Sequence, residues 1–134
     1  MSNKHLNTEN QSQPSVFKCG AATHVGNVRT SNQDKYGITS NLITVADGMG
    51  GHKGGEIAAE IAVTTLISAN GFQSINEFAE LVQKAHHLIQ VRAQENINLD
   101  GMGTTLCALS EINTEETSQR IGAVNVGDSR IYLY

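Results

Sequence analysis

Residues 42–56 read LITVADGMGGHKGGE, an apolar run that ends in a carboxylate and a glycine-dense segment. The first five residues, Leu42–Ala46, are apolar or β-branched, which favours a strand. Turn residues separate them from Tyr36–Thr39, the expected partner strand of a hairpin. A helix is expected to begin near Glu56, after the glycines. The stretch therefore predicts a strand that ends at Asp47 and leads through a glycine loop into a helix.

Two helices are expected in the middle of the chain. Apolar residues recur at roughly helical spacing after Glu56, and Gly71 suits the position just beyond a helix end. Ser74 and Glu77 form a capping-box pair. This pair predicts the start of a second helix, which runs to about Glu95.

Strands are expected on both sides of these helices. Besides the hairpin, the predicted strands are Phe17–Val25, Thr104–Leu109, Ile121–Val126 and Arg130–Tyr134. Strands, two helices and then strands is an order typical of an α+β fold. We therefore expect an antiparallel sheet with the helices on one face.

The composition excludes several classes of partner. The 134 residues include 9 Lys and Arg against 13 Asp and Glu, so the net charge is −4. This balance gives no basic surface for nucleic acid and no polybasic patch for a membrane. No stretch approaches the ~20 consecutive apolar residues that span a bilayer. Residues 1–15 are polar and lack a secretory signal, so we expect a disordered leader, a folded region over 16–134 and a cytoplasmic location.

Three short polar segments contain residues that suit metal and phosphate chemistry. Asp47 follows an apolar strand and precedes glycines, so its carboxylate can ligate a hard divalent cation. Arg29 and Asp34 can hold a phosphate and order a metal-bound water, respectively. Asp128 again places a carboxylate at the end of an apolar strand. Taken singly, each segment is more often a simple turn or a solvated loop.

Together, four segments resemble the first motifs of the metal-dependent protein phosphatases, the PPM or type 2C protein serine/threonine phosphatase family, in its bacterial form. The motifs are RTSNQD at Arg29–Asp34, VADGMGGH at Val45–His52 with Gly55-Glu56, GMGTTL at Gly101–Leu106, and VGDSR at Val126–Arg130. The resemblance covers about residues 17–134, which is nearly everything after the leader. Four motifs in the family's order make it specific.

The resemblance implies a fold, a reaction and partners. The implied fold is an antiparallel β-sandwich flanked by helices, present here as its N-terminal portion. The implied function is hydrolysis of phosphoserine and phosphothreonine in proteins by a metal-activated water at a binuclear Mn²⁺ or Mg²⁺ centre, with a third, weaker metal site. The implied partners are a phosphorylated protein and a cognate serine/threonine kinase.

The resemblance also implies a role for five residues. Asp47 matches the aspartate that bridges both metals, and Gly48 matches the glycine whose carbonyl completes one metal's coordination shell. Asp34 matches an acid that orients metal-bound water. Arg29 matches the arginine that grips the substrate phosphate, and Asp128 matches the aspartate of the third metal site.

This sequence departs from the family at two positions. Gln33 stands where many members have Glu, which removes one outer-shell charge. Met49 stands where some members have a histidine that is a proposed general acid. The proton donor is therefore unassigned.

The charge balance of the expected metal centre is incomplete. Two divalent ions carry four positive charges, whereas Asp34, Asp47 and Asp128 supply at most three negative ones. The family's two further aspartates belong to motifs beyond this length. We therefore expect this chain alone to bind Mn²⁺ poorly and to hydrolyse phosphoesters slowly or not at all.

Two alternatives to an enzyme stay open. One is a truncated, non-catalytic phosphatase-like module that regulates or binds another protein. The other is a phosphate- or nucleotide-binding module, because a strand, glycines and a helix are the layout of such sites. The glycine loop satisfies neither GxxxxGK[ST] nor GxGxxG, which disfavours the nucleotide alternative.

Overall fold

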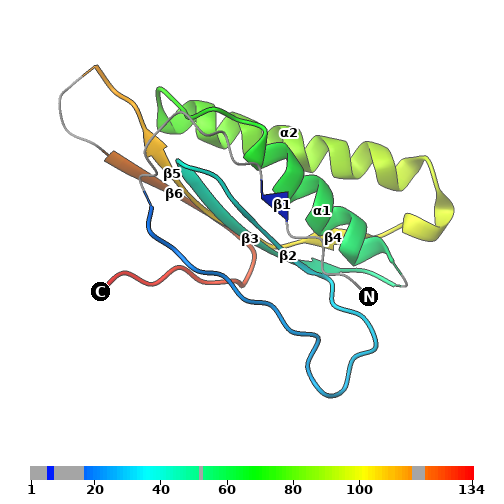
Figure 1. Ribbon diagram of the computed structural model, residues 1–134. Coiled ribbons are helices and arrows are strands. Elements are labelled where there is room, and N and C mark those ends of the chain that lie inside the picture. The colour runs from blue at the N-terminus through cyan, green and yellow to red at the C-terminus, as the bar shows by residue number, and fades with distance from the viewer. Residues whose placement is uncertain (1–5, 8–16, 52, 116–119) are drawn as a thin grey trace.

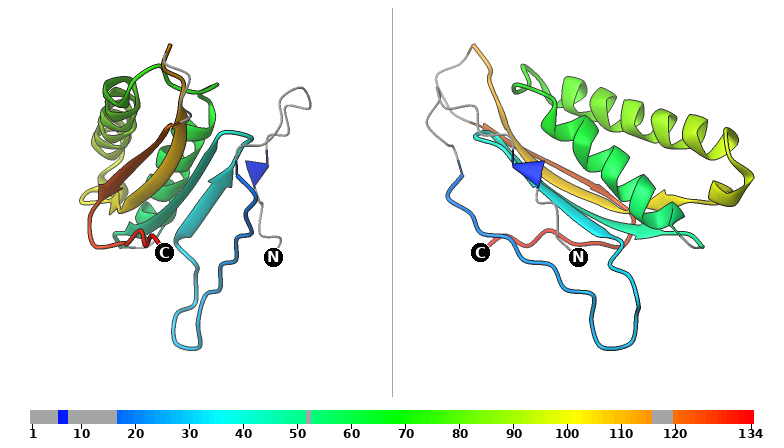
Figure 2. Two further views of the ribbon diagram at one scale, coloured as in Figure 1. Left: turned by 90° about the vertical axis from the view of Figure 1, so that its left-hand side faces the viewer. Right: turned by 45° about the vertical axis from the view of Figure 1, so that its right-hand side comes forward.

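The chain forms one six-stranded sheet with two helices on one of its faces (Figures 1 and 2). The computed structural model describes residues 6–7, 17–51, 53–115 and 120–134. The strands are β1 (Leu6–Asn7), β2 (Asp34–Ile38), β3 (Leu42–Met49), β4 (Gly103–Thr104), β5 (Leu106–Ile112) and β6 (Arg120–Val126). The helices are α1 (Gly54–Ile67), α2 (Ile75–Gln94) and the short 3₁₀ helix η1 (Ile97–Leu99).

The sheet is antiparallel except at one edge. Its order is β1-β2-β3-β5-β6, and β4 pairs with the end of β3. The hairpin of β2 and β3 places Asp34 directly opposite Asp47. Along β3, Leu42 and every second residue after it are buried towards the helices, whereas Val45, Asp47 and Met49 are exposed on the other face. Asp34 of β2 and Asp47 of β3 therefore lie on the face of the sheet that lacks helices.

Close packing of α1 on the sheet forms the core. Val63 and Leu66 of α1 are fully buried, as is Phe78 of α2. A Cβ atom at Gly37 of β2 would lie only 2.5 Å from Ile67 Cγ2 and 2.8 Å from Val63 Cγ1. Gly37 therefore lets the last turns of α1 approach the sheet directly.

Most of the predicted elements are confirmed. The hairpin, both helices and the strands at 104–109 and 121–126 are present. The Ser74 hydroxyl accepts from the Glu77 backbone N–H at 3.2 Å, as the capping-box pair predicts. The α+β class with helices on one face of an antiparallel sheet is also confirmed.

Two predicted strands are wrong. Phe17–Val25 and Arg130–Tyr134 both run beside the sheet without joining it as strands. An apolar pattern makes a strand only where the backbone joins the hydrogen-bond ladder of a neighbouring strand, and neither segment is a strand of the sheet in the structure. Leu133 and Tyr134 accordingly remain fully exposed.

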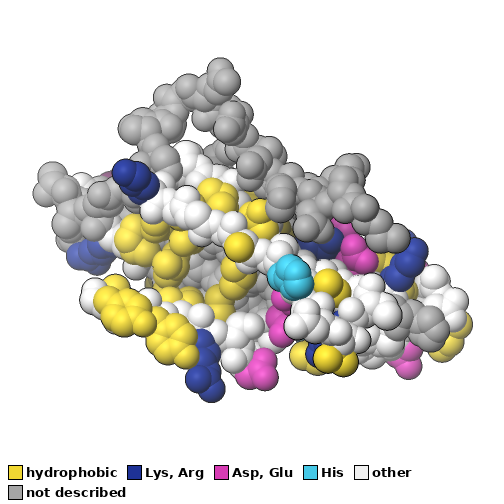
Figure 3. All heavy atoms as spheres, turned by 60° about the horizontal axis from the view of Figure 1, so that its bottom comes forward, with side chains coloured by type: hydrophobic (Ala, Val, Ile, Leu, Met, Phe, Trp, Pro, Cys, Tyr) yellow, Lys and Arg dark blue, Asp and Glu magenta, His cyan; other side chains and the backbone are white. Residues whose placement is uncertain are grey.

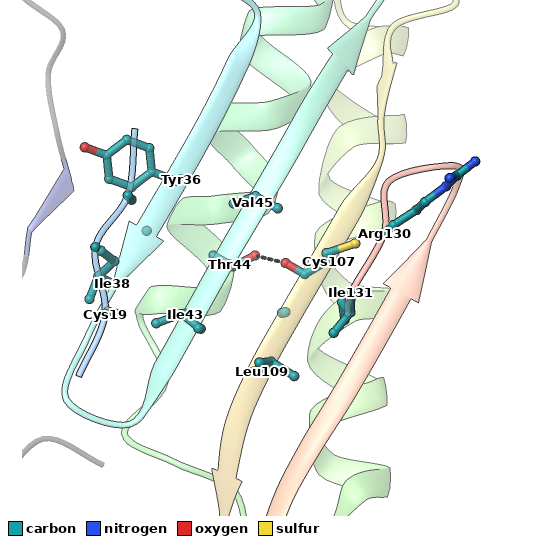
Figure 4. A pocket seen from close by; sticks show the side chains of 14 residues that line it. Cys19, Tyr36, Ile38, Ile43, Thr44, Val45, Cys107, Leu109, Arg130 and Ile131 are labelled. Atoms are coloured by element: carbon teal, nitrogen blue, oxygen red, sulfur yellow. Dashed lines mark hydrogen bonds between the residues drawn. The ribbon is translucent and has the colours of Figure 1, made fainter. Parts of the chain in front are cut away.

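The face of the sheet opposite the helices is apolar. Its floor includes Ile43, Val45 and Leu109, and a cavity of about 210 Å³ lies between Cys19 on one side and Ile131 on the other (Figure 4). Figure 3 shows hydrophobic side chains around this hollow. Such a surface is typical of the inner face of a sandwich, and the described residues contain one sheet only.

Most of the predicted leader lies outside the described residues. Within it, Leu6–Asn7 pairs in parallel with Gly37–Ile38 of β2. Among the described residues, no helix is both long and apolar enough to cross a membrane.

Candidate functional site

An open cavity of about 630 Å³ lies where β3 ends. Four of the five predicted site residues line it: Arg29, Asp47, Gly48 and Asp128. They come from three separate segments, namely the connection before β2, the end of β3 and the turn after β6. The fold therefore brings together residues that are as far as 99 positions apart in the chain (128 − 29).

The fifth residue, Asp34, stands beside Asp47 across the hairpin. The two residues are partners in the β2–β3 pairing. Partial burial raises the pKa of the Asp34 carboxyl, and the charge of Asp47 and a hydrogen bond to it raise that pKa further. The guanidinium of Arg29 acts in the opposite direction but does not outweigh them. The site therefore holds two mutually repelling carboxylates next to a cation.

The backbone around Gly48 explains why the carboxylates stand at this edge. The Gly48 N–H donates to the carbonyl of Gln33 at 3.2 Å. A Cβ atom at Gly48 would overlap the carbonyl of Gly55 and would lie 2.9 Å from the Gln33 oxygen. The first turn of α1 thus packs directly on β3, and only glycine fits between them.

The glycine loop after β3 is held by its neighbours. The Gln33 side chain donates to the carbonyl of Gly50 at 3.4 Å, so the amide that replaces the family's usual acid contacts the loop. Gly50 has a φ of 135° and its missing Cβ leaves room for Met102. Met49 is 56% exposed and lines the cavity. His52 lies outside the described residues.

The carboxylates fit a divalent cation only in part. Paired aspartates supply the hard oxygen donors that Mg²⁺ and Mn²⁺ prefer, and a cation between them would relieve their repulsion. Asp128 reaches the same cavity. However, in the part of the chain that the structure describes, no three His, Cys, Asp or Glu side chains are grouped closely enough to hold a metal.

Sequence reasoning missed one contributor to the site, Thr105. Its side chain is 3% exposed, lines the cavity and accepts the backbone N–H of Asp47 at 3.1 Å. The motif Gly101–Leu106, which contains Thr105, could have indicated this contribution, but the sequence analysis assigned no role to it.

Replacement of Asp34 by asparagine should stabilise the metal-free chain. Because the folded pKa of Asp34 is raised, its ionised form lowers stability as the pH rises through that pKa. Asp34→Asn should therefore increase the free energy of unfolding at pH 7 by about 0.5 kcal/mol, since the side chain is exposed and screened. The difference should shrink as the pH falls below ~4, where the wild-type carboxyl is protonated.

Urea unfolding in EDTA at several pH values would measure this effect. Asp100→Asn, at an exposed carboxylate beyond η1, is the control and should show no such gain. A less stable Asp34→Asn variant at neutral pH would show that the two carboxylates do not oppose each other.

Comparison with known proteins identifies relatives over most of the chain. The family model of protein phosphatase 2C matches residues 22–134. The serine/threonine protein phosphatase PstP of Mycobacterium tuberculosis is 32% identical over 122 residues, which is 88% of this chain and 23% of that protein. The protein phosphatase PhpP of Streptococcus pneumoniae is 41% identical over 127 residues, 83% of this chain and 48% of that protein.

Solved structures agree with this result. The catalytic domain of PstP, solved in complex with two manganese ions, superposes with a TM-score of 0.70 at 32% identity. The match covers 80% of this chain and 46% of the PstP domain. The chain therefore spans half or less of the length of these relatives.

Proposed function

The chain belongs to the protein phosphatase 2C family, and we propose on that premise that it supplies the phosphate-binding arginine and the first metal-binding carboxylates of a metal-dependent serine/threonine protein phosphatase. Its substrate would be a phosphorylated protein, the opposing enzyme a serine/threonine kinase, and its location the cytoplasm.

One observation carries this proposal. Arg29 lines the same open cavity as Asp47 and Asp128, and Asp34 stands beside Asp47. Without a bound cation, a pair of carboxylates would repel a phosphate. The guanidinium of Arg29 beside them therefore indicates a site for a negatively charged ligand as well as for a cation. The combination suits a phosphate that is held between a cation and an arginine.

The residues of this chain would act through position and charge. Asp34, Asp47 and the carbonyl of Gly48 would hold the divalent cations, with Asp128 at a further, weaker site. When bound, these cations would activate a water for attack on phosphorus and offset negative charge. Arg29 would orient the phosphate and stabilise its equatorial oxygens through a two-pronged hydrogen bond.

The alternative modules have less support. A nucleotide site on the glycine loop would place a phosphate against the repelling carboxylates Asp34 and Asp47 unless a cation intervened. A non-catalytic module would share the fold but would have no need for an arginine beside paired carboxylates.

Manganese binding to this chain tests the proposal. Amide NMR spectra should show that Mn²⁺ broadens the signals of Asp34, Asp47 and Gly48 first and that of Asp128 at higher concentration. Release of phosphate from a phosphothreonine peptide should be slow or undetectable, because among the described residues no three ligand side chains are grouped closely enough to hold a metal. Broadening confined to signals outside this cavity, or ATP binding in EDTA at the glycine loop, would contradict the proposal.

Replacement of Arg29 tests phosphate binding separately. Arg29→Ala should weaken the binding of inorganic phosphate in Mg²⁺ by about tenfold, because a charge-assisted hydrogen bond contributes ~1.5–3 kcal/mol. Arg29→Lys should restore only part of the affinity, since lysine lacks the planar fork. Phosphorus NMR titration would measure both.

The matched control is Arg92→Ala. Arg92 is an exposed arginine of α2 that pairs with Glu95 at 3.2 Å, and it does not line the cavity. Equal losses in the two alanine variants would mean that phosphate responds only to net charge.

A further inference from the structure

Thr105 lies between the two segments that carry cavity-lining carboxylates. It sits in the one-residue gap between β4 and β5, below the end of β3. Its backbone N–H donates to the carbonyl of Asp47 at 2.9 Å, and its Oγ1 accepts the Asp47 N–H at 3.1 Å. Both backbone groups of Asp47 are thus bound by one residue that is 58 positions away.

The same hydroxyl reaches the turn that carries Asp128. Thr105 Oγ1 and Ser129 Oγ are 2.5 Å apart, and either hydroxyl can donate. Since Oγ1 accepts from Asp47 and is also bonded to Ser129, it forms a bridge between the two segments.

The methyl group of Thr105 contacts the same turn. Gly127 has a φ of 94°, and a Cβ atom there would lie 2.9 Å from Thr105 Cγ2. The turn therefore packs on the methyl and hydrogen-bonds to the hydroxyl. Because Thr105 is nearly fully buried, water does not readily replace either contact.

We propose that Thr105 is the positioning residue that fixes the carboxylates of Asp47 and Asp128 relative to each other across the cavity. The inference rests on the proposed function, because this geometry matters only if both carboxylates hold cations in the same cavity. It gives a role to the motif Gly101–Leu106. Thr105 would act through its contacts with Asp47 and Ser129 and needs no charge to do so.

Two variants separate the hydroxyl from the methyl. Thr105→Val keeps the branched shape and removes the bridge, whereas Thr105→Ser keeps the hydroxyl and removes the methyl. Ser129→Ala removes only the link to the turn and leaves the bond to Asp47. A double variant with Thr105→Val and Ser129→Ala shows whether the two hydroxyls act together.

The first test uses the metal-free chain. Thr105→Val should speed hydrogen exchange of the Asp47 amide at least about fivefold, since it loses a hydrogen bond worth ~1 kcal/mol. Thr105→Ser should leave that exchange within about twofold of the wild type after correction for global stability. Backbone order at Asp128 should fall in Thr105→Val and in Ser129→Ala, and the double variant should be no worse than Thr105→Val.

The second test adds Mn²⁺ and follows amide broadening. In the wild type, Asp47 should respond first and Asp128 at a higher, fixed multiple of that concentration. Thr105→Val should change this ratio by at least about fivefold, and Thr105→Ser should leave it unchanged.

Two results would overturn the inference. One is that Thr105→Val and Thr105→Ser change exchange and broadening at Asp47 and Asp128 equally, in proportion to the stability that each variant loses, which would indicate ordinary packing. The other is that Thr105→Val shows the same exchange and broadening as the wild type. If Mn²⁺ broadens no signal at Asp34 or Asp47 in the wild type, the proposed function fails, and the metal-free exchange then decides the positioning role.

Discussion

Replacement of Gly48 by alanine is expected to lower the free energy of unfolding by about 3 kcal/mol or more. The added methyl would overlap the carbonyl of Gly55 and press on the carbonyl of Gln33, 2.9 Å away. All of these atoms belong to backbone, so no side-chain rotation can make room. The end of β3 and the start of α1 would have to separate, and the cavity would lose its edge.

Urea unfolding followed by circular dichroism would measure the loss. Gly51→Ala is the matched control, because a Cβ atom at Gly51 meets nothing within 4 Å. It should change stability by less than about 0.5 kcal/mol. If Gly48→Ala is as stable as this control, the contact between β3 and α1 is looser than the structure indicates. Should Gly48→Ala prove insoluble while Gly51→Ala folds, the prediction is met in its strongest form.

Replacement of Asp47 by asparagine is expected to reduce Mn²⁺ affinity by roughly 100-fold. A unit charge in contact with a divalent cation is worth several kcal/mol even at an effective dielectric constant of ~20. The same change removes the charge that raises the pKa of Asp34, so the metal-free chain should not be destabilised. Metal affinity and stability should therefore change separately.

Isothermal titration with Mn²⁺ and urea unfolding in EDTA would measure the two effects. Glu80→Gln, at an exposed carboxylate of α2, is the control and should leave Mn²⁺ affinity unchanged. Any Mn²⁺-dependent hydrolysis by the wild type should also disappear in Asp47→Asn. Retained affinity in Asp47→Asn would place the metal elsewhere and would contradict the proposed role of this carboxylate.

Local patterns in the sequence were enough to predict the β2–β3 hairpin and helix α2. The hairpin follows from β-branched residues on both sides of a turn, and α2 follows from the pair Ser74 and Glu77. The motifs also predicted that Arg29, Asp47 and Asp128 would share a site, and one cavity does hold them.

The two wrong strands and the missed role of Thr105 depend on long-range contacts, which local sequence patterns do not reveal. Phe17–Val25 and Arg130–Tyr134 have strand-like composition, but a strand also needs a neighbour. The bridge from Thr105 to Asp47 and Ser129 joins residues that are 58 and 24 positions apart. Spacing within a motif cannot reveal such a bond, since it depends on where the sheet brings three segments together.

The turn between β2 and β3 has a consequence for the chemistry at the far end of the hairpin. Thr39 fastens it, since its N–H donates to the Leu42 carbonyl at 2.8 Å and its hydroxyl accepts the Leu42 N–H at 3.0 Å. Inserting or deleting one residue in this turn would shift the pairing of β2 and β3 by one residue. Each side chain of β3 would then point to the opposite face of the sheet. The Asp47 carboxylate would then face the apolar core beneath α1, and the Leu42 side chain would face the solvent. A loop without any catalytic group thus decides on which side of the sheet a cation could bind.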